Sequence, residues 1–446
     1  MVKVCASVRT VEELEKTGDA DIVEVPIEVY RNLQNPPQKP MVVKVSSQEE
    51  SLEMFNKKWN GYLDIGELPR PEMDMPIIAS VHDDLRTMSS PDIVKKMEGF
   101  SCDIAVGTFM INRPADLVSL MDASRLVKKK HVLVGLGEMG YITRYRSALL
   151  GNEFEYAHVG TPSYIGQMSV DEIMETGSDS LIIGLIGHPL SQSASKRMHT
   201  QALKDAGING HYINIDTVSL DGMDDVIRDY DIKGMNVTIP YKSDILAYVD
   251  VLDQSAKNTG AASMIVNTGD RLVGSNTDVD GARFALERAG VEIEVGMKIL
   301  VIGSGGVAMA CCYLFTSEGA DVTIIGRNQK TVQNLCKKFG CESTDRIDPS
   351  DYDMIVNCTP IGMYEEETYP IDITKLRQEQ IVFDVVYTKE TKLEAVARER
   401  GCKIIPGLDM LIGQGIRSFE VWTGVKPSYE SMRYSLVGDS GRMNIS

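Results

Sequence analysis

The chain has 446 residues, of which 43% are hydrophobic and 25% charged, and its formal net charge is −18. Because this length exceeds what one hydrophobic core usually supports, we expect two or three domains of ordinary globular composition. Nucleic acids and anionic membranes attract basic surfaces, so the acidic balance argues against both as main partners.

The cysteines and the amino-terminal residues indicate a cytoplasmic protein. The chain has 8 cysteines and no C-x-x-C pair, which is typical of free thiols in a reducing compartment and argues against a metal site or a disulfide framework. The first residues, MVKVCASVRT, lack the apolar core of a signal peptide. No apolar run approaches the length that crosses a bilayer.

The first part of the chain, residues 1–176, alternates short apolar runs with polar stretches that are mostly of helix length. The runs are VKVCASV, ADIVEVPI, MVVKVS, GYLDIGE, PIIASVHD, CDIAVGTF, HVLVGLGE and FEYAHVG. This alternation predicts a parallel (β/α) barrel, trimmed because the segment is short for that fold. The alternative is an open, doubly wound sheet.

Two further α/β units are predicted after the barrel. A substrate domain begins with the strand SLIIGLIG and continues through KGMNVTIP and AASMIVN. A Rossmann domain begins with MKILVIGSGGVAMA, which reads as strand, glycine turn and helix, and continues through DVTIIGR, MIVNCTP and IVFDVVY. The tail from Asp409 to Trp422 is predicted to be an amphipathic helix. We expect the substrate domain at 180–278 and 409–446, and the Rossmann domain at 279–408.

The run from Gly303 to Ala308 predicts a dinucleotide site, since it has the form G-x-G-x-x-A between a strand and a helix. Gly303 permits the tight turn, and Gly305 lets the backbone approach a pyrophosphate at the helix N-terminus. A merely tight turn is the alternative. Arg327 follows the next strand, where an acidic residue would bind a free ribose hydroxyl. An arginine there suits a 2′-phosphate and favours NADP, although a solvated loop arginine would look the same.

Three polar clusters precede the nucleotide motif. In the first, GHPLSQSAS, alternate serines suit a carboxylate or a polyol, or they cap a helix. The second, NVTIPYK, ends in Lys242, and the third, SNTD, ends in Asp278. A lysine at a helix start is electrostatically unfavourable, which suggests that it serves an anion. Lys242 could protonate an alkoxide as hydride reaches a ketone, held by Asp278, or the two could be a surface lysine and a helix cap.

From about Leu181 to its end, the chain resembles the shikimate dehydrogenases. The matching stretches, in family order, are GLIGHPLSQSASKRMH, GMNVTIPYK, GSNTDVDG, VIGSGGVAMA, NCTPIGM, FDVVY and GLDMLIGQG. The resemblance implies NADPH-dependent reduction of a small molecule, 3-dehydroshikimate, to shikimate, a step of the shikimate pathway to aromatic amino acids. Two serines in the first stretch favour shikimate over quinate. A homodimer is a further hypothesis.

The resemblance also implies the roles of individual residues. Lys242 would be the catalytic acid and base, paired with Asp278. The implied substrate contacts are Ser193, Ser195, Thr238, Lys242, Ser263, Asp278, Tyr387 and Gln414. The implied cofactor contacts are Gly303, Gly305, Gly306, Val307, Arg327, Val385 and Gly407. Ser263 stands where the family has an asparagine, and a hydroxyl makes fewer hydrogen bonds than an amide.

Residues 1–176 resemble, more faintly, the type I 3-dehydroquinate dehydratases, which are (β/α) barrels known to be fused to shikimate dehydrogenase. The resemblance makes His82 the general acid and base of the barrel. It makes Glu24, Arg144 and Gln167 contacts of the barrel's substrate.

The dehydratase resemblance fails at the lysine that forms an imine with the substrate. Asp103 occupies the place where the family has this lysine, in a K-I-A sequence, and a carboxylate cannot form an imine. Ser46 replaces a family arginine, with Lys44 close by. We therefore predict a reductase with an impaired barrel. The alternative is a bifunctional enzyme in which Lys44 substitutes. A non-catalytic nucleotide-binding regulator is a third hypothesis. The presence of both Lys242 and Asp278 argues against it.

Overall fold

The computed structural model describes residues 2–35, 37–57, 59–177, 179–344, 347–363 and 368–438. Within these ranges the chain forms three β-sheets and divides into two compact units. One unit contains residues 1–182 and 213–232, and the other contains residues 183–212 and 233–446. The predicted division of the second unit into a substrate and a Rossmann domain remains a prediction, and residues 439–446 of its tail lie outside the described ranges.

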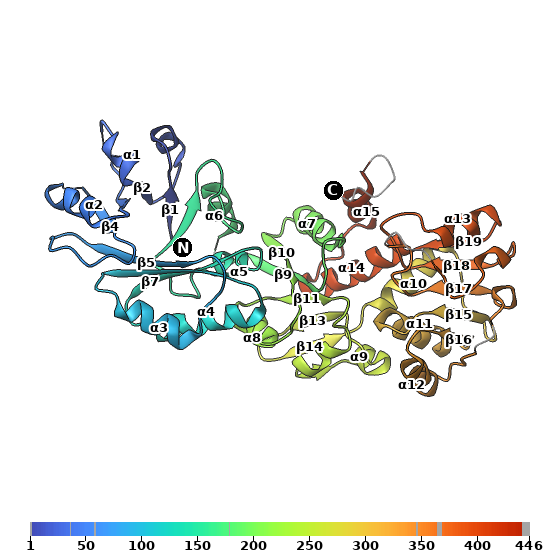
Figure 1. Ribbon diagram of the computed structural model, residues 1–446. Helices are drawn as coiled ribbons and strands as arrows, with labels where there is room; N and C mark the ends of the chain where they lie inside the picture. The colour runs from blue at the N-terminus through green and yellow to red at the C-terminus, as the bar shows by residue number, and fades with distance from the viewer. Residues whose placement is uncertain are drawn as a thin grey trace. The chain divides into compact units, whose positions relative to one another are not determined.

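The first sheet confirms the predicted barrel (Figure 1). Its strands are β1 (Lys3–Ser7), β2 (Ile22–Pro26), β3 (Met41–Lys44), β4 (Gly61–Asp64), β5 (Ile77–Asp83), β6 (Ile104–Met110), β7 (Lys130–Leu136) and β8 (Phe154–His158). From β1 to β7 each strand pairs in parallel with the next strand in sequence, and β8 pairs in parallel with β1. This sequential order excludes a doubly wound sheet. A bridge between His131 and Asn152 brings the remaining edges together.

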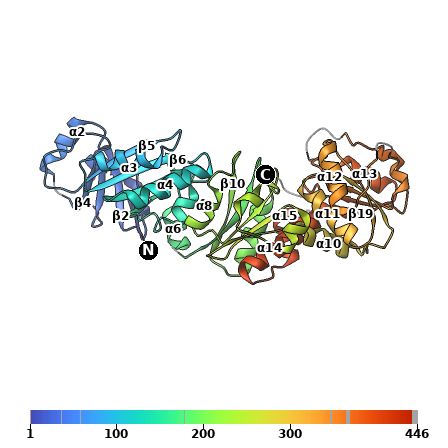
Figure 2. The same ribbon diagram turned by 90° about the horizontal axis from the view of Figure 1, so that it is seen from below.

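The barrel is trimmed on its outer side, as expected from its length. Its helices are η1 (Val11–Lys16), α1 (Ile27–Arg31), α2 (Gln48–Glu53), η2 (Met54–Asn56), α3 (Ser90–Gly99), α4 (Pro114–Leu126), α5 (Tyr141–Tyr145) and α6 (Val170–Thr176). No helix joins β4 to β5 in residues 65–76, all of which are described. The longest of these helices, α3 and α4, pack side by side (Figure 2).

Alternate residues of each barrel strand point to opposite faces of the sheet. One buried cluster contains only strand residues, with members on all eight strands when the half-buried Tyr62 is included, and is therefore the barrel interior. Another contains strand residues together with helix residues such as Ile27 and Met54, and is the outer layer. On β6 the interior positions are Ile104 and Val106, so that Thr108 shares their face.

The second sheet contains β9 (Leu181–Gly187), β10 (Gly210–Asp216), β11 (Gly234–Val237), β12 (Val251–Leu252), β13 (Met264–Asn267) and β14 (Leu272–Ser275). Their order is β10-β9-β11-β13-β14-β12, with β13 antiparallel to both neighbours. Its helices are α7 (Ser195–Asp205), α8 (Met223–Asp229), η3 (Asp244–Tyr248), α9 (Gln254–Thr259) and α10 (Asp278–Ala289). The strands β10, β12 and β14 lie outside the three apolar runs from which this domain was predicted.

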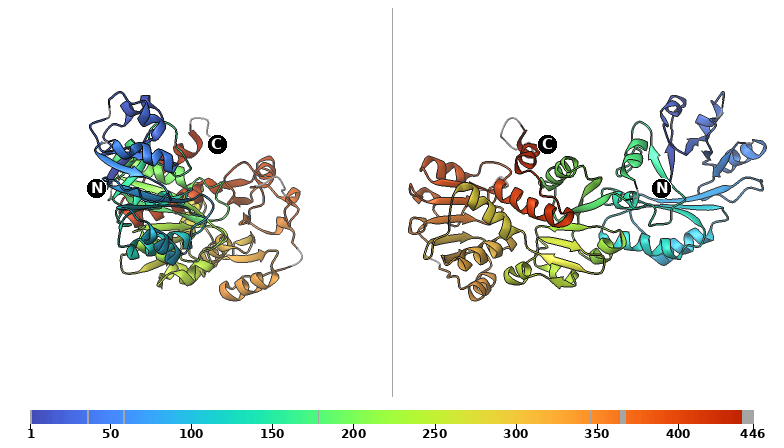
Figure 3. Two further views of the ribbon diagram at one scale, coloured as in Figure 1. Left: turned by 60° about the vertical axis from the view of Figure 1, so that its left-hand side comes forward. Right: turned by 180° about the vertical axis from the view of Figure 1, so that it is seen from behind.

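The third sheet is parallel, with the order β16-β15-β17-β18-β19, and a bridge from Thr323 of β16 to Glu342 lies where a Rossmann sheet has a further strand. Its strands are β15 (Lys298–Ile302), β16 (Asp321–Ile325), β17 (Met354–Asn357), β18 (Ile381–Asp384) and β19 (Lys403–Pro406). The helices are α11 (Gly306–Ser317), α12 (Gln329–Phe339), η4 (Pro349–Asp351), η5 (Ile373–Lys375), α13 (Lys392–Glu399), α14 (Gly407–Thr423) and α15 (Tyr429–Val437). The long helix α14, red in Figure 3, packs against α10 and α7. None of the described helices has the length and hydrophobicity that a bilayer crossing demands.

Candidate active site

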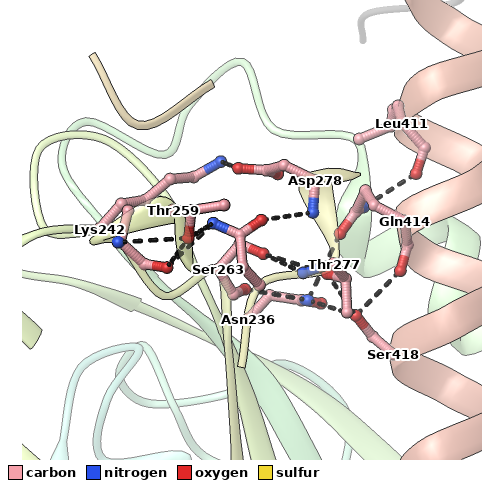
Figure 4. A network of polar contacts seen from close by, with 11 residues as sticks. Asn236, Lys242, Thr259, Ser263, Thr277, Asp278, Leu411, Gln414 and Ser418 are labelled. Carbon is pink, nitrogen blue, oxygen red and sulfur yellow. Dashed lines mark hydrogen bonds and ion pairs between the residues drawn. The ribbon is translucent and has the colours of Figure 1, made fainter. Parts of the chain in front are cut away.

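Lys242 and Asp278 form a buried ion pair in the second unit (Figure 4). Lys242 lies in the turn between β11 and η3, and Asp278 is the first residue of α10. The Lys242 Nζ lies 2.5 Å from the Asp278 Oδ2, and the two side chains are only 12% and 6% exposed. A carboxylate at a helix N-terminus is stabilised by the helix dipole, and a charge-assisted hydrogen bond in a buried site is strong. The pair is therefore fixed in position.

The turn before α10 is held by the buried side chain of Asn276. Its Nδ2 donates to the Thr259 Oγ1 at 3.1 Å and to the Ala261 carbonyl oxygen at 2.9 Å. Its Oδ1 accepts the Asp278 backbone N–H at 3.0 Å. Because every polar atom of this amide has a partner, the start of α10 and the Asp278 carboxylate keep one orientation.

A cavity of about 270 Å³ opens beside this ion pair. The structure brings together at its wall all the residues that the sequence analysis named as substrate contacts of the reductase: Ser193, Ser195, Thr238, Lys242, Ser263, Asp278, Tyr387 and Gln414. Ser195 is the first residue of α7, an 11-residue helix. Because backbone N–H groups at a helix N-terminus are free to bind an anion, this end of the cavity suits a carboxylate.

A second, larger cavity of about 1290 Å³ lies at the carboxyl edge of the third sheet. Gly303, Gly305, Gly306, Val307 and Arg327 line it. Gly303 has a positive φ of +118°, and a Cβ there would lie 3.0 Å from the Cys358 carbonyl oxygen, so the turn requires glycine. A Cβ added at Gly305 would meet no atom within 4 Å, so there is open space above the start of α11.

The two cavities share lining residues, among them Lys242 and Val307. Gly306, the first residue of α11, packs directly on the lysine. A Cβ at position 306 would lie 2.7 Å from the Lys242 Cδ. The third glycine of the motif therefore admits the lysine side chain to the junction of the cavities, a role that the sequence analysis did not foresee.

Ser263 belongs to a hydrogen-bonded network behind the ion pair (Figure 4). Its Oγ lies 2.8 Å from the Thr277 backbone nitrogen and 3.1 Å from the Thr277 Oγ1. The Thr277 Oγ1 lies 3.3 Å from the Oγ of Ser418 on α14. Asn236 on β11 donates to the same Ser418 Oγ at 2.9 Å and accepts the Tyr212 hydroxyl at 2.9 Å.

The first unit has its own group of charged residues on the interior face of the barrel. The Lys44 Nζ lies 4.0 Å from the Asp64 Oδ2, with side-chain exposures of 40% and 1%. The Ser80 hydroxyl donates to the Asp64 Oδ1 at 3.0 Å. Burial raises the pKa of Glu24 to about 7, although the nearby Lys44 ammonium opposes this shift.

His82 lies at the end of β5, in register with Thr108 of β6. Its Nδ1 is 2.7 Å from the Thr108 Oγ1. Burial lowers the pKa of His82, and the Lys44 ammonium lowers it further. The imidazole is therefore neutral near pH 7 and has the protonation state of a base.

The carboxyl-terminal part of the chain is similar to known reductases over nearly the full length of those reductases. A shikimate dehydrogenase (NADP(+)) of Methanococcus aeolicus is 35% identical over 276 residues, which are 58% of this chain and 98% of that protein. The chain belongs to the shikimate dehydrogenase family. Solved family members agree with this assignment. A shikimate dehydrogenase in complex with NADP+ is 35% identical, with a TM-score of 0.55, and the similarity covers 58% of this chain and 95% of that one.

The Thermus thermophilus enzyme, solved in complex with NADP(H) and shikimate, is 28% identical with a TM-score of 0.53. That similarity covers 57% of this chain and 98% of the other. The family model of the shikimate dehydrogenase substrate binding domain matches residues 185–265, and that of the shikimate 5′-dehydrogenase C-terminal domain matches residues 407–436. The type I 3-dehydroquinase model matches residues 64–178. Both resemblances inferred from the sequence are thus confirmed.

Arg144 and Gln167, predicted as substrate contacts of the barrel, have hydrogen-bond partners within the chain. The Arg144 side chain is fully buried and forms an ion pair with Glu155. It also donates to the Tyr156 carbonyl oxygen at 2.9 Å and to the Tyr164 hydroxyl at 2.7 Å. Gln167 is buried and accepts the backbone N–H of Ser163 at 2.7 Å. The Arg144 side chain and the Gln167 Oε1 are thus held by partners within the chain, and the role of both residues toward a ligand stays a prediction.

Asp103 lies away from His82 in the structure. This residue precedes β6, and its carboxylate accepts the Ile77 backbone N–H at 2.8 Å and the Arg70 Nη2 at 3.0 Å. It therefore lies at the entry of the strands, whereas His82 lies at their exit. The residues of β6 that share a face with Thr108, the register partner of His82, are Ile104, Val106 and Met110. This face of β6 therefore offers no amine, and the ammonium that acts on His82 is that of Lys44 on β3.

Several residues around the substrate cavity were missed in the sequence. Tyr212 lies on β10, a strand that was not predicted, and stacks on His199 with ring centroids 4.6 Å apart. Burial lowers the pKa of His199 to about 3, so this histidine stays neutral in the core. Ser418 follows Gln414 by one helical turn, so the i, i+4 spacing on the predicted amphipathic helix was the signal available for finding it.

Proposed function

We propose that the protein is an NADPH-dependent shikimate dehydrogenase that reduces 3-dehydroshikimate to shikimate. The observation that carries the proposal is the ion pair of Lys242 and Asp278, at the junction of a polar cavity with a nucleotide-sized cavity. The activity for which the relatives are named supports it. Ser193 and Ser195, at the N-terminus of α7, would bind the substrate carboxylate.

The proton chemistry follows from the geometry of the pair. NADPH, when bound, supplies hydride to the ketone carbon. The Lys242 ammonium then donates a proton to the ketone oxygen as negative charge develops on it. Asp278 holds the ammonium in place before the transfer through their charge-assisted hydrogen bond. In the reverse direction the neutral amine takes the proton from the hydroxyl.

The residues of the third sheet fit a dinucleotide with a 2′-phosphate. The open space above Gly305 lets a pyrophosphate approach the N-terminus of α11, where backbone N–H groups are free. Arg327 follows β16, is exposed and lines the same cavity. Its guanidinium can bind a phosphate through two parallel hydrogen bonds. Val385 and Gly407 line the substrate cavity, where they would contact the nicotinamide.

The sheets suggest how this activity is divided among domains. The barrel would occupy residues 1–176. The substrate domain would occupy 180–278 and 409–446, and the Rossmann domain 279–408. The order of the five-stranded parallel sheet supports the last assignment. The free thiols of all 8 cysteines support a cytoplasmic location.

For the barrel we propose an impaired dehydratase. Its interior face offers no amine on β6, and Arg144 is engaged by Glu155. A bifunctional enzyme is the second candidate, because Lys44 is an amine on the interior side of β3 beside Asp64. That amine lies near two acidic residues, Asp64 and Glu24.

A coupled assay tests both halves of this proposal. Purified protein with NADPH is given 3-dehydroshikimate and, separately, 3-dehydroquinate, and NADPH consumption is followed by absorbance. We expect turnover of the first compound alone. No turnover of either would refute the reductase. Turnover from 3-dehydroquinate, with borohydride trapping of an imine on Lys44 detected by peptide mass, would establish the bifunctional alternative.

A further inference from the structure

A chain of hydrogen bonds next to the reacting pair has a direction that is fixed by what each atom can donate (Figure 4). The Oγ of Ser418, which is fully buried, lies 2.9 Å from the carbonyl oxygen of Gln414. A carbonyl oxygen only accepts, so the hydroxyl donates its single proton there. Toward its other neighbours the Ser418 Oγ can therefore only accept.

The amide of Asn236 agrees with this direction. Its Nδ2 lies 2.9 Å from the Ser418 Oγ and 3.5 Å from the carbonyl oxygen of Ser263 and from the Gln414 Oε1. Its Oδ1 accepts the Tyr212 hydroxyl at 2.9 Å. Since three oxygens surround the amide nitrogen, Asn236 donates to the Ser418 Oγ. The Ser418 hydroxyl therefore keeps its own hydrogen bond to the Gln414 carbonyl oxygen.

The direction then passes through Thr277 to Ser263. The Thr277 Oγ1, 3.3 Å from the Ser418 Oγ, must donate to it. Thr277 then has no proton left for Ser263, so the Ser263 hydroxyl donates across their 3.1 Å contact. The Ser263 Oγ also accepts the Thr277 backbone N–H at 2.8 Å. A serine hydroxyl has one proton and two lone pairs, so a single lone pair remains.

We propose that Ser263 contacts the substrate only as a hydrogen-bond acceptor, and that Ser418 sets this direction without touching the substrate. Ser263 lines the cavity with Lys242 and Asp278, whereas Ser418 is absent from the lining. The inference rests on the proposed function and deepens it. The group recognised beside Ser263 is a ring hydroxyl that donates its proton. An oxygen or fluorine that only accepts would face the serine lone pair.

The family's asparagine would behave differently, because an amide both donates and accepts. Ser263 thus makes this chain more selective at one ring position. Ser418 acts as a positioning residue: it accepts the Thr277 proton and so commits the Ser263 proton to Thr277. Removing the Ser418 hydroxyl frees the Thr277 proton to turn to Ser263, which in turn frees the Ser263 proton for the ligand.

The test uses shikimate and analogues in which each ring hydroxyl other than the oxidised one is replaced by fluorine or by hydrogen. The measurements are kcat/KM for oxidation with NADP+ and Kd by titration calorimetry. At one ring position, replacing the hydroxyl by fluorine or by hydrogen should lower kcat/KM and raise Kd of the wild-type enzyme, each about tenfold, because neither analogue donates a proton there. The fluoro and deoxy compounds should there agree within about twofold. Fluoro analogues that all match shikimate in kcat/KM and Kd, whichever hydroxyl is replaced, would overturn the proposal.

Variants separate direction from structural support. In Ser418→Ala the kcat/KM and the affinity of the fluoro analogue should exceed those of the deoxy analogue by about threefold or more at that position. A purely structural role for Ser418 would weaken shikimate and both analogues equally and would contradict the inference. Thr277→Val, which also frees the Ser263 proton, should give the same gain if Ser418→Ala does not fold. In Ser263→Ala the preference for the hydroxyl at that position should vanish.

Failure of the proposed function has a different signature. If wild-type enzyme oxidised no shikimate, the reductase assignment would fail. The Kd comparison requires no turnover, so it would still decide the direction of the Ser263 hydrogen bond.

Discussion

Each unit of the molecule places a lysine beside an aspartate, and the two pairs differ in contact and burial. In the second unit the Lys242 Nζ lies 2.5 Å from the Asp278 Oδ2, and both side chains are withdrawn from solvent. In the barrel the Lys44 Nζ lies 4.0 Å from the Asp64 Oδ2, and the lysine is 40% exposed. A buried, directly bonded pair is fixed, whereas a half-exposed one is weakened by solvent.

The difference arises in the packing around each lysine. Gly306 leaves room for the Lys242 side chain at the start of α11, and Asn276 fixes the carboxylate that meets it. Asp64 already accepts the Ser80 hydroxyl, and Lys44 reaches the solvent. The same two residue types near strand ends therefore form a reactive pair only where the surrounding backbone brings them into contact.

The largest expected effect breaks the pair in the second unit. Lys242→Ala should lower kcat for shikimate oxidation by about 10²–10⁴, because the proton loses its donor and acceptor. Lys44→Ala is the matched control and should leave this activity within about twofold of wild type. Steady-state absorbance of NADPH measures both. Equal losses in the two variants would show that the comparison between the pairs is wrong.

The next effect concerns the buried pair that occupies Arg144 in the barrel. Glu155→Gln leaves a buried guanidinium without its charge partner, so the unfolding free energy of the barrel should fall by about 3–5 kcal/mol. Urea unfolding can be followed by Trp59 fluorescence in a Trp422→Phe background. Glu153→Gln, which breaks an exposed pair with Lys130, should cost less than about 1 kcal/mol. An unchanged midpoint for Glu155→Gln would indicate that Arg144 is free to bind a ligand.

A smaller effect tests cofactor choice in the second unit. Arg327→Ala should raise KM for NADPH about 10–100-fold and change that for NADH little, because the lost hydrogen bonds are charge-assisted bonds to the 2′-phosphate. Steady-state kinetics with both cofactors measure the ratio. Arg377→Ala, which removes a guanidinium that donates to Ser350 and is absent from the cavity wall, serves as the control. An equal rise for NADH would place Arg327 outside the phosphate site.

The smallest effect concerns the acid beside Lys44. Because burial raises the pKa of Glu24 to about 7, the folded barrel holds a proton that the unfolded chain releases above its lower, ordinary pKa. The contribution of Glu24 to the stability of the barrel should thus be largest at low pH and fall, on the order of 1 kcal/mol, between about pH 5 and pH 8. Glu24→Gln should flatten this dependence, and Glu28→Gln on the exposed side of α1 should not. Stability that rises over this range would contradict the assignment.

How much of the site could be read from the sequence depended on local pattern. The glycine turn after β15, the serines before α7 and the residues Lys242 and Asp278 all follow strand ends, and carboxyl ends of parallel strands gather at one edge. These predictions placed the reductase residues on one cavity wall. The barrel predictions were weaker, because inward and outward positions alternate along a strand. An alignment that is shifted along the strand therefore assigns a residue to the wrong face or to the wrong end of the barrel. That Asp103 takes the place of the family's lysine stays a prediction for this reason.

The sequence alone determined the order of the α/β elements, the family of the second unit and the residue types of its reacting pair. These properties depend on periodicity and on motifs within a few consecutive residues. Only the tertiary structure decided that Gly306 accommodates Lys242, that Glu155 occupies Arg144, and that Ser418 on α14 sets the hydrogen-bond direction at Ser263. Each of these contacts joins residues from different elements, and the distance and donor geometry on which it depends arise only once the chain has folded.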